Sequence, residues 1–218
     1  MSVAAPELSP PQLDFRVEDV AATEYAAVPT LLFSVGIAVA GPSVRSLALN
    51  VQVRIDAPRR AHNDRERERL FELFGAPADW SRTLRSLRWT SASVTVPPFD
   101  ERTTVELPIA CTYDFDVVAT KYLHALEPGD VPLELLFSGS VFFAGAGGRL
   151  QVVYLPWDRE ARCELPVHVW RAAVETAFPG TGWLRVRHDV LERLHAYRSA
   201  HTLLTWDATL ERLLKEAE

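Results

Sequence analysis

The feature that most constrains the fold is a pair of long segments in which apolar residues occupy every second position. In residues 47–55 each odd-numbered residue is Leu, Val or Ile, and polar or small residues stand between them. Residues 31–39 repeat this pattern with small residues in between. Because successive side chains of a β-strand leave opposite faces, a period of two predicts two half-buried strands. Gly41-Pro42-Ser43 lies between them, which predicts a hairpin with a short loop.

The same alternation continues in weaker form along much of the chain. It predicts further strands near residues 13–17, 87–96, 105–109, 133–143 and 150–154, the last two joined by a turn at Gly145–Gly148. About seven strands with short turns, and no regular helices between them, favour an antiparallel sandwich or barrel over a parallel α/β sheet. The predicted fold class is therefore α+β, mainly antiparallel β and sandwich-like, with one inserted helix and about three C-terminal helices.

The inserted helix is expected in an excursion at residues 58–80. Asn63 or Asp64 can cap this helix, and its apolar stripe ends at Gly75. The segment 117–126 stays open between a strand and a helix, because its first residues favour one and its later residues the other.

Three regions are expected along the chain. Residues 1–12 are rich in Pro, Ala and Ser and are expected to form a flexible tail. Residues 13–155 are expected to form the sandwich. Residues 156–218 have the helical period and predict helices beginning near Pro166, His188 and Thr205. Because three short amphipathic helices make a small core, we expect this region to dock on the sheet.

Composition and charge narrow the function classes. A formal net charge of −6 and a pI near 5.6 argue against a nucleic-acid binder, which usually has a basic surplus. No apolar stretch is long enough to span a bilayer, and the N-terminus lacks the basic and apolar parts of a signal peptide. We therefore expect a cytoplasmic protein. Lys121 and Lys215 are the only lysines, which indicates GC-rich coding and hence a high-GC bacterium.

No motif of a metal, cofactor or nucleophile site stands out. Cys111 and Cys163 have no metal-ligand spacing, and the sequence leaves open whether they are close. The six histidines include no pair with the HExxH spacing of zinc peptidases. Gly-x-Ser-x-Gly is absent, and the glycines at 145–148 lack the lysine of a phosphate-binding loop. We therefore expect no metal, no cofactor and no catalytic residues.

The densest group of ionisable residues is Asp114, Asp116, Lys121 and His124. Asp114 and Asp116 would share one face of a strand, where two carboxylates can hold a cation or a proton. The same alternation is explained if Tyr113 and Phe115 face the core and the two aspartates face water. The four residues are thus the candidate binding residues of an alternative function, a small-ligand-binding protein or enzyme with a pocket between the sandwich and the C-terminal helices.

Six tryptophans are many for 218 residues and favour a different function. Large aromatic residues dominate both cores and protein interfaces. A single tryptophan is best explained by core packing, whereas six together favour an apolar-aromatic surface that binds a partner. The main hypothesis is therefore a non-catalytic interaction protein, which predicts an exposed aromatic patch or an exposed sheet edge. A self-associating structural subunit is a further alternative.

Short motifs along the chain after residue 12 resemble an uncharacterised domain-of-unknown-function family of high-GC bacteria. They are Lys121–Leu126, Val131–Leu133, Phe137–Phe142, Pro156-Trp157, Leu165–Trp170 and Thr205–Asp207. The resemblance implies an association with gene neighbourhoods of nickel-iron hydrogenases. It implies an accessory or chaperone-like role in their assembly or maturation, with a hydrogenase subunit or maturation factor as partner. The chain lacks the paired Cys-x-x-Cys motifs that bind the metal centres, so the resemblance does not make it the hydrogenase itself.

Overall fold

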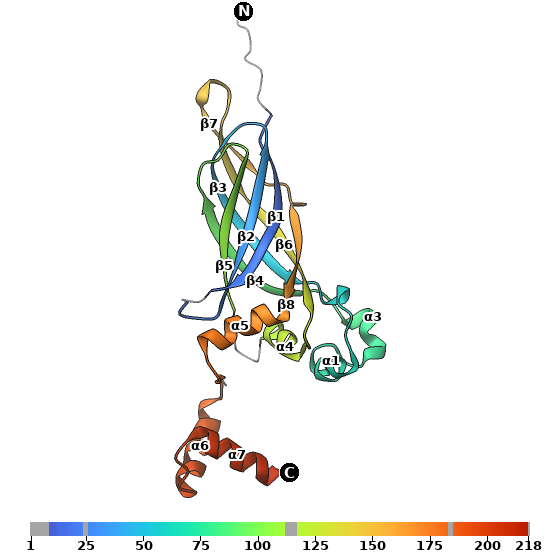
Figure 1. Ribbon diagram of the computed structural model, residues 1–218, viewed down its shortest axis with the longest axis vertical. Coiled ribbons are helices and arrows are strands. Elements are labelled where there is room, and N and C mark those ends of the chain that lie inside the picture. The colour runs from blue at the N-terminus through green and yellow to red at the C-terminus, as the bar shows by residue number, and fades with distance from the viewer. Residues whose placement is uncertain (1–8, 24–25, 112–116, 183–184, 218) are drawn as a thin grey trace, which may run out of the picture. The chain divides into compact units, whose positions relative to one another are not determined.

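Figure 1 shows the computed structural model, which describes residues 9–23, 26–111, 117–182 and 185–217. The chain divides into two compact units, Met1–Gly182 and Trp183–Glu218, which we call the N-terminal unit and the C-terminal unit. All strands of the described residues belong to the N-terminal unit.

Two antiparallel sheets form the frame of the N-terminal unit. Sheet A has the strand order β1-β2-β5, and sheet B has the order β4-β3-β6-β7, with β8 also paired to β6. The strands are β1 (Gln12–Ala22), β2 (Thr30–Ala40), β3 (Val44–Ile55), β4 (Leu87–Val96), β5 (Arg102–Ala110), β6 (Asp130–Ala144), β7 (Leu150–Tyr154) and β8 (Glu160–Pro166). The predicted fold class, α+β with a sandwich-like antiparallel framework, is confirmed.

The hairpin predicted for residues 31–39 and 47–55 is wrong. Both segments are strands, but β2 pairs with β1 and β5, whereas β3 pairs with β4 and β6. The residues 41–43 therefore carry the chain from sheet A to sheet B. A strand buries one face whether its sequence neighbour lies beside it or in the opposite sheet, so alternation alone cannot distinguish the two arrangements.

The core lies between the two sheets and is filled by the inward faces of both. Phe33 on β2 and Val53 on β3 are both fully buried. Phe15 of β1 stacks on Phe137 of β6 with ring centroids 4.3 Å apart, which joins the sheets directly. Each fully buried aliphatic or aromatic side chain contributes about 1.5–3 kcal/mol, so the period-two pattern is the main source of stability.

Strand β6 has different neighbours along one of its edges. Its residues 130–136 pair with β8, and its residues 140–144 pair with β7. Gly139 stands at the change of neighbour with a φ of +152°, a backbone conformation that favours glycine. A Cβ atom at Gly139 would lie 2.0 Å from the carbonyl oxygen of Ala48 on β3. The close approach of β3 and β6 at this point therefore requires a glycine.

The excursion predicted at 58–80 is helical and is divided into short segments. They are η1 (Ala57–Arg59), α1 (Asp64–Arg69), α2 (Phe71–Phe74), η2 (Pro77–Asp79) and α3 (Trp80–Thr83). Asn63 caps α1, since its side chain accepts from the Glu66 N–H while the Glu66 carboxylate accepts from the Asn63 N–H. The segment that was open between strand and helix forms helix α4 (Val118–Ala125).

The region from residue 156 onward differs from the expected all-helical arrangement at its start. Residues 160–166 form β8, in which Ala161 and Leu165 point inward and charged residues point outward. This strand has only seven residues, and three of them are charged, so its period-two pattern is weak in the sequence. Helix α5 (Val167–Ala177) follows, packs against β1, β2 and β8, and buries Trp170 to 1% exposure.

Within the N-terminal unit, the helices gather at one end of the sheets. Figure 1 shows α1, α3, α4 and α5 at the same end, and the hairpin of β6 and β7 at the opposite end. Helix α4 contacts β4 as well, so the helices close this end of the core. No such helical cover lies over β7 in the described part of this unit.

The C-terminal unit consists of helices α6 (His188–Ala200) and α7 (Trp206–Ala217). The Trp206 ring lies edge-on to His195, with centroids 4.8 Å apart, and under the Arg198 guanidinium at 4.6 Å. Tyr197 donates to the Glu216 carboxylate at 2.9 Å. Of the described residues in this unit, Thr209 alone is buried, so aromatic and polar contacts hold the two helices together.

Candidate functional site

The four candidate residues from the sequence are only partly described by the structure. Asp114 and Asp116 lie outside the described residues. Lys121 and His124 both belong to α4, and their side chains contact different helices. Neither residue lines the two hollows described below. Lys121 and His124 thus contact different helices, and a site formed by all four residues stays a prediction.

The contacts of the two described candidates show what each can do. Lys121 forms an ion pair with Glu72 of α2. The His124 ring lies edge-on to Trp170 of α5, with ring centroids 4.8 Å apart. Burial lowers the pKa of His124, and the nearby positive charge of Arg171 lowers it further. Lys121 thus joins α4 to α2, whereas His124 is a neutral packing residue against α5 at neutral pH.

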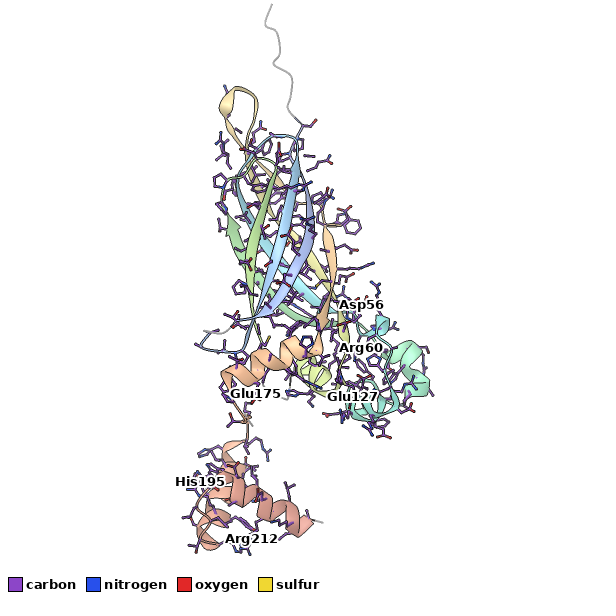
Figure 2. The ribbon with its side chains drawn as sticks, in the orientation of Figure 1. Asp56, Arg60, Glu127, Glu175, His195 and Arg212 are labelled. Carbon is purple, nitrogen blue, oxygen red and sulfur yellow. The ribbon has the colours of Figure 1, made fainter. Side chains whose placement is uncertain are left out.

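A buried ion pair fastens the helical excursion to the rest of the unit. The Arg60 guanidinium donates to the Glu66 carboxylate at 2.9 Å, to the Glu127 carbonyl at 3.1 Å and to the Asp130 carbonyl. Glu66 also accepts from the Glu127 N–H at 2.8 Å. Figure 2 shows Arg60 and Glu127 next to each other at the helical end of the sheets. The ion pair thus links the excursion to the segment between α4 and β6.

The ionisation of this network fits a structural role. Burial alone would raise the pKa of Glu66, but its hydrogen bonds to Arg60 and to two backbone N–H groups lower the pKa overall. Beside it, the His62 Nε2 lies 3.0 Å from the Tyr122 hydroxyl. Burial lowers the pKa of His62 and raises that of Tyr122. The network therefore holds one ion pair and one neutral pair, which join the excursion to α4 and to the segment after it.

Two hollows occur on the surface of the N-terminal unit. One, of about 330 Å³, lies on the outer face of sheet A, where Gly36 leaves space between charged residues of β1 and β5. Within it, Arg16 and Thr104 both donate to the Glu18 carboxylate. The other, of about 580 Å³, lies beside α3 and is lined by residues 54, 58, 80, 81 and 84–86. Both are shallow and open to solvent.

Three other kinds of site are not formed by the described residues. Within them, no three His, Cys, Asp or Glu side chains could together hold a metal ion. Cys111 and Cys163 are both free, and burial raises the pKa of each thiol to about 12, so neither is a reactive thiolate at neutral pH. Of the helices in the described ranges, none has the length and apolar character needed to cross a membrane.

The feature that departs most from an ordinary surface is strand β7. Leu150, Val152 and Tyr154 have exposed fractions of 68%, 54% and 77%, and Trp157, just beyond the strand, is 93% exposed. Leu150, Val152 and Tyr154 share one face of the strand because they are two residues apart. Phe142 of β6, which pairs with Val152, is only partly buried and extends the same surface. An antiparallel sheet usually turns polar residues to water, so this apolar surface requires an explanation.

The backbone N–H and C=O groups of residues 150, 152 and 154 also have no partner strand in the described part of the chain. On the side of β6, the N–H of Leu155 bonds the Gly139 carbonyl, and the N–H of Gly145 bonds the Arg149 carbonyl. In an antiparallel pair these bonds alternate along the strand, so Gln151 and Val153 also direct their backbone groups toward β6. The N–H and C=O groups of residues 150, 152 and 154 consequently point to the other edge. No strand of the described residues pairs with that edge.

We call this surface, made of Leu150, Val152, Tyr154, Trp157 and Phe142 with the open backbone of β7, the β7 edge. The strand predicted at residues 150–154 is confirmed, because these residues form β7. Sequence reasoning did not predict which residues would face outward, because alternation defines two faces without saying which one is buried. The available signal was the absence of charged residues between positions 150 and 157, which is unusual for an edge strand.

The sequence of the chain matches one protein family. A family model described as "Family of unknown function (DUF6084)" matches residues 10–218, nearly the whole chain. Among curated proteins, none matches the sequence.

Solved structures give distant matches. A protein described as late embryogenesis abundant (LEA) has 13% identity and a TM-score of 0.33, over 72% of this chain and 71% of that one. The sporulation control protein Spo0M from Bacillus subtilis has 12% identity and a TM-score of 0.23, over 85% of this chain and 55% of that one. A β-glucosidase from Kluyveromyces marxianus has 13% identity and a TM-score of 0.26, over 71% of this chain and 15% of that one.

Proposed function

The chain belongs to the DUF6084 family, a family of unknown function, and we propose that it is a non-catalytic interaction protein that docks a partner chain along the β7 edge. One observation carries this proposal. The three residues whose backbone groups point away from β6 are the same three whose apolar side chains are exposed. Strand addition uses both features, because backbone hydrogen bonds supply affinity and alternate side chains supply specificity.

Hydrogen bonding and apolar burial both favour the binding of a partner strand to the β7 edge. Backbone groups at an open edge are solvated, so each hydrogen bond to a partner strand contributes only about 0.5–1.5 kcal/mol. The apolar side chains add more, since removing apolar surface from water contributes roughly 25 cal/mol per Å². Trp157 and Tyr154 are the residue types most often dominant in protein interfaces. The strongest contribution is therefore expected from the aromatic end of β7.

The resemblance noted in the sequence supplies a more specific form of the proposal. In that form the protein is an accessory or chaperone-like factor in the cytoplasm of a high-GC bacterium. Its partner is a subunit or maturation factor of a nickel-iron hydrogenase. An open edge can hold a strand of a partner that is not yet paired within the partner's own fold. The partner stays a prediction of this proposal.

The test is recovery of the partner from the native host with tagged full-length protein and with two matched variants. Val152→Lys places a charge at the centre of β7, and Thr95→Lys places one on the exposed face of β4, at the opposite edge of the same sheet. We expect the wild type and Thr95→Lys to recover the same stoichiometric partner, identified by mass spectrometry. We expect Val152→Lys to lower its recovery about tenfold or more, the effect of removing a central interface contact.

The proposal fails if Val152→Lys recovers the partner as well as the wild type does. Both substituted side chains are exposed, so both variants are expected to fold, and circular dichroism checks this. A hydrogenase subunit or maturation factor among the recovered proteins, lost only in Val152→Lys, would support the more specific form as well.

A further inference from the structure

We propose that the partner strand on the β7 edge is β7 of a second copy of the chain. This inference rests on the proposed function, since it needs the β7 edge to be a docking surface. It is an alternative to the hydrogenase form of that proposal, because the same stretch of strand edge pairs with one strand at a time. The two strands pair antiparallel about a two-fold axis at Val152. In this register Leu150 lies opposite Tyr154 of the second copy, and Val152 lies opposite itself.

The backbone pattern of β7 allows this register. Residues 150, 152 and 154 direct their N–H and C=O groups to the open edge. A two-fold axis at Val152 pairs each of these residues with another member of the same set, so all three pairs are of the hydrogen-bonded type. An axis at Gln151 or at Val153 would leave one end of the strand without a strand residue opposite it. The central register therefore forms the largest number of backbone hydrogen bonds.

The side chains of β7 are complementary to themselves in the same register. Pairing places Tyr154 of each copy beside Leu150 of the other, an aromatic-aliphatic pair, and places the two β-branched Val152 side chains together. The strand Leu150–Tyr154 contains no charged residue, so the two copies bring no like charges opposite each other. Trp157 adds apolar surface at each end of the shared ladder.

The symmetry of the contact determines what it assembles. Because the same surface is used on both copies, the contact closes after two chains and does not propagate into a fibre. The order β4-β3-β6-β7 would then continue through the two-fold axis into a sheet of twice the width. A five-residue strand makes a small interface, at the low end of specific protein contacts, so the dimer is expected to depend on concentration.

The experiment uses charge at the two-fold axis. Sedimentation velocity of the wild type over a range of concentrations is expected to show a monomer–dimer equilibrium. Val152→Lys and Val152→Glu each place two like charges opposite one another, and each is expected to raise the dissociation constant about tenfold or more. An equimolar mixture of these two variants places opposite charges together, so it is expected to recover dimer. Thr95→Lys is the control and should dimerise like the wild type.

A second measurement reads the register directly. Residues opposite each other in a hydrogen-bonded pair have Cα atoms about 5.5 Å apart, which a disulfide can span. Under mild oxidation Val152→Cys is expected to form a cross-linked dimer quickly. Gln151→Cys, which lies on the other face of β7, is the matched control and should cross-link much more slowly. The native thiols, buried Cys111 and partly buried Cys163, are present in both variants.

The outcomes separate this inference from the proposed function. Recovery of the dimer by mixing the two Val152 variants supports the inference. A wild type that stays monomeric, while Val152→Lys still loses a different partner, overturns the inference and leaves the proposed function standing. A dimer that Val152→Lys and Val152→Glu do not weaken overturns the inference, because the contact then lies elsewhere. If neither self-association nor partner recovery responds to Val152, both proposals fail.

Discussion

Strands β7 and β8 follow one another along the same edge of β6, yet they present opposite surfaces. In β8 the outward residues are Glu160, Arg162 and Glu164. In β7 the outward residues are the apolar set of the β7 edge. Charged residues on an edge strand prevent another strand from adding to it. One half of this sheet edge is therefore protected against pairing, whereas the other half has no charged residue to prevent it.

The neighbours of the two strands strengthen the contrast. Near β8, Arg159 forms an ion pair with Asp14 of β1 at 3.3 Å, and α5 packs against both β1 and β8. The β7 half lies at the other end of the sheets, away from the helices of this unit (Figure 1). The β8 half of the edge is therefore covered by the chain itself, whereas we propose that another chain covers the β7 half.

The largest expected effect comes from truncating a leucine in each strand. Leu165 of β8 is fully buried, whereas Leu150 of β7 is 68% exposed. We expect Leu165→Ala to lower the free energy of unfolding by about 2–5 kcal/mol, because it removes buried contacts and leaves a cavity. Leu150→Ala should change it by less than about 0.5 kcal/mol. Urea unfolding of both variants measures this, and equal losses would show that β7 is buried in the monomer.

An intermediate effect is expected from pH, and it should come from the helical end alone. Burial lowers the pKa of His62 and of His124, so both are neutral in the fold and gain protons more readily when the chain unfolds. Their contribution to stability is complete above the unfolded pKa of about 6.5 and is lost as the pH falls below it. Each additional proton bound on unfolding gives at most about 1.4 kcal/mol per pH unit.

The measurement is urea unfolding between pH 6.5 and pH 5, above the range in which the carboxylates titrate. We expect His62→Gln to have a shallower dependence on pH than the wild type, because one of the two histidines with a lowered pKa is gone. Identical slopes would contradict the assignment. Strand β7 contributes nothing to this dependence, since it contains no histidine, aspartate or glutamate.

The smallest effect on stability should come from the aromatic residues beside β7. The double variant Tyr154→Thr and Trp157→Ser removes most of the exposed aromatic surface. We expect the free energy of unfolding to change by less than about 0.5 kcal/mol, because both side chains are exposed in the monomer. Binding of an apolar fluorescent dye to the folded protein should fall clearly. Unchanged dye binding would mean that this surface is not the main apolar patch.

The sequence predicted the kinds of element better than their neighbours. Alternation at residues 31–39 and 47–55 identified both strands, because burial of one face leaves a direct record in the sequence. It could not assign them to different sheets, since pairing depends on residues far away along the chain. The strand at 160–166 was not predicted, because its charged outward residues and short length resemble an exposed loop or helix start as much as a strand.

The candidate site shows the same limit more sharply. Six tryptophans predicted an apolar-aromatic surface, but the sequence did not say which of them are buried. Trp170 is 1% exposed and Trp157 is 93% exposed, although both lie near the boundary of a strand or helix. The polar candidates were chosen for their density along the chain. Lys121 and His124 instead contact separate helices, Lys121 through Glu72 of α2 and His124 through Trp170 of α5.

The glycine at position 139 has a consequence for how this family can diversify. Any side chain there would collide with the carbonyl oxygen of Ala48, so the glycine cannot be replaced without a compensating change in β3. A family member that carries a larger residue at this position should therefore have lost either the close approach of β3 or the switch of β6 between its two neighbours. Glycine at position 139 is therefore expected in those family members whose β6 pairs with two different strands along one edge.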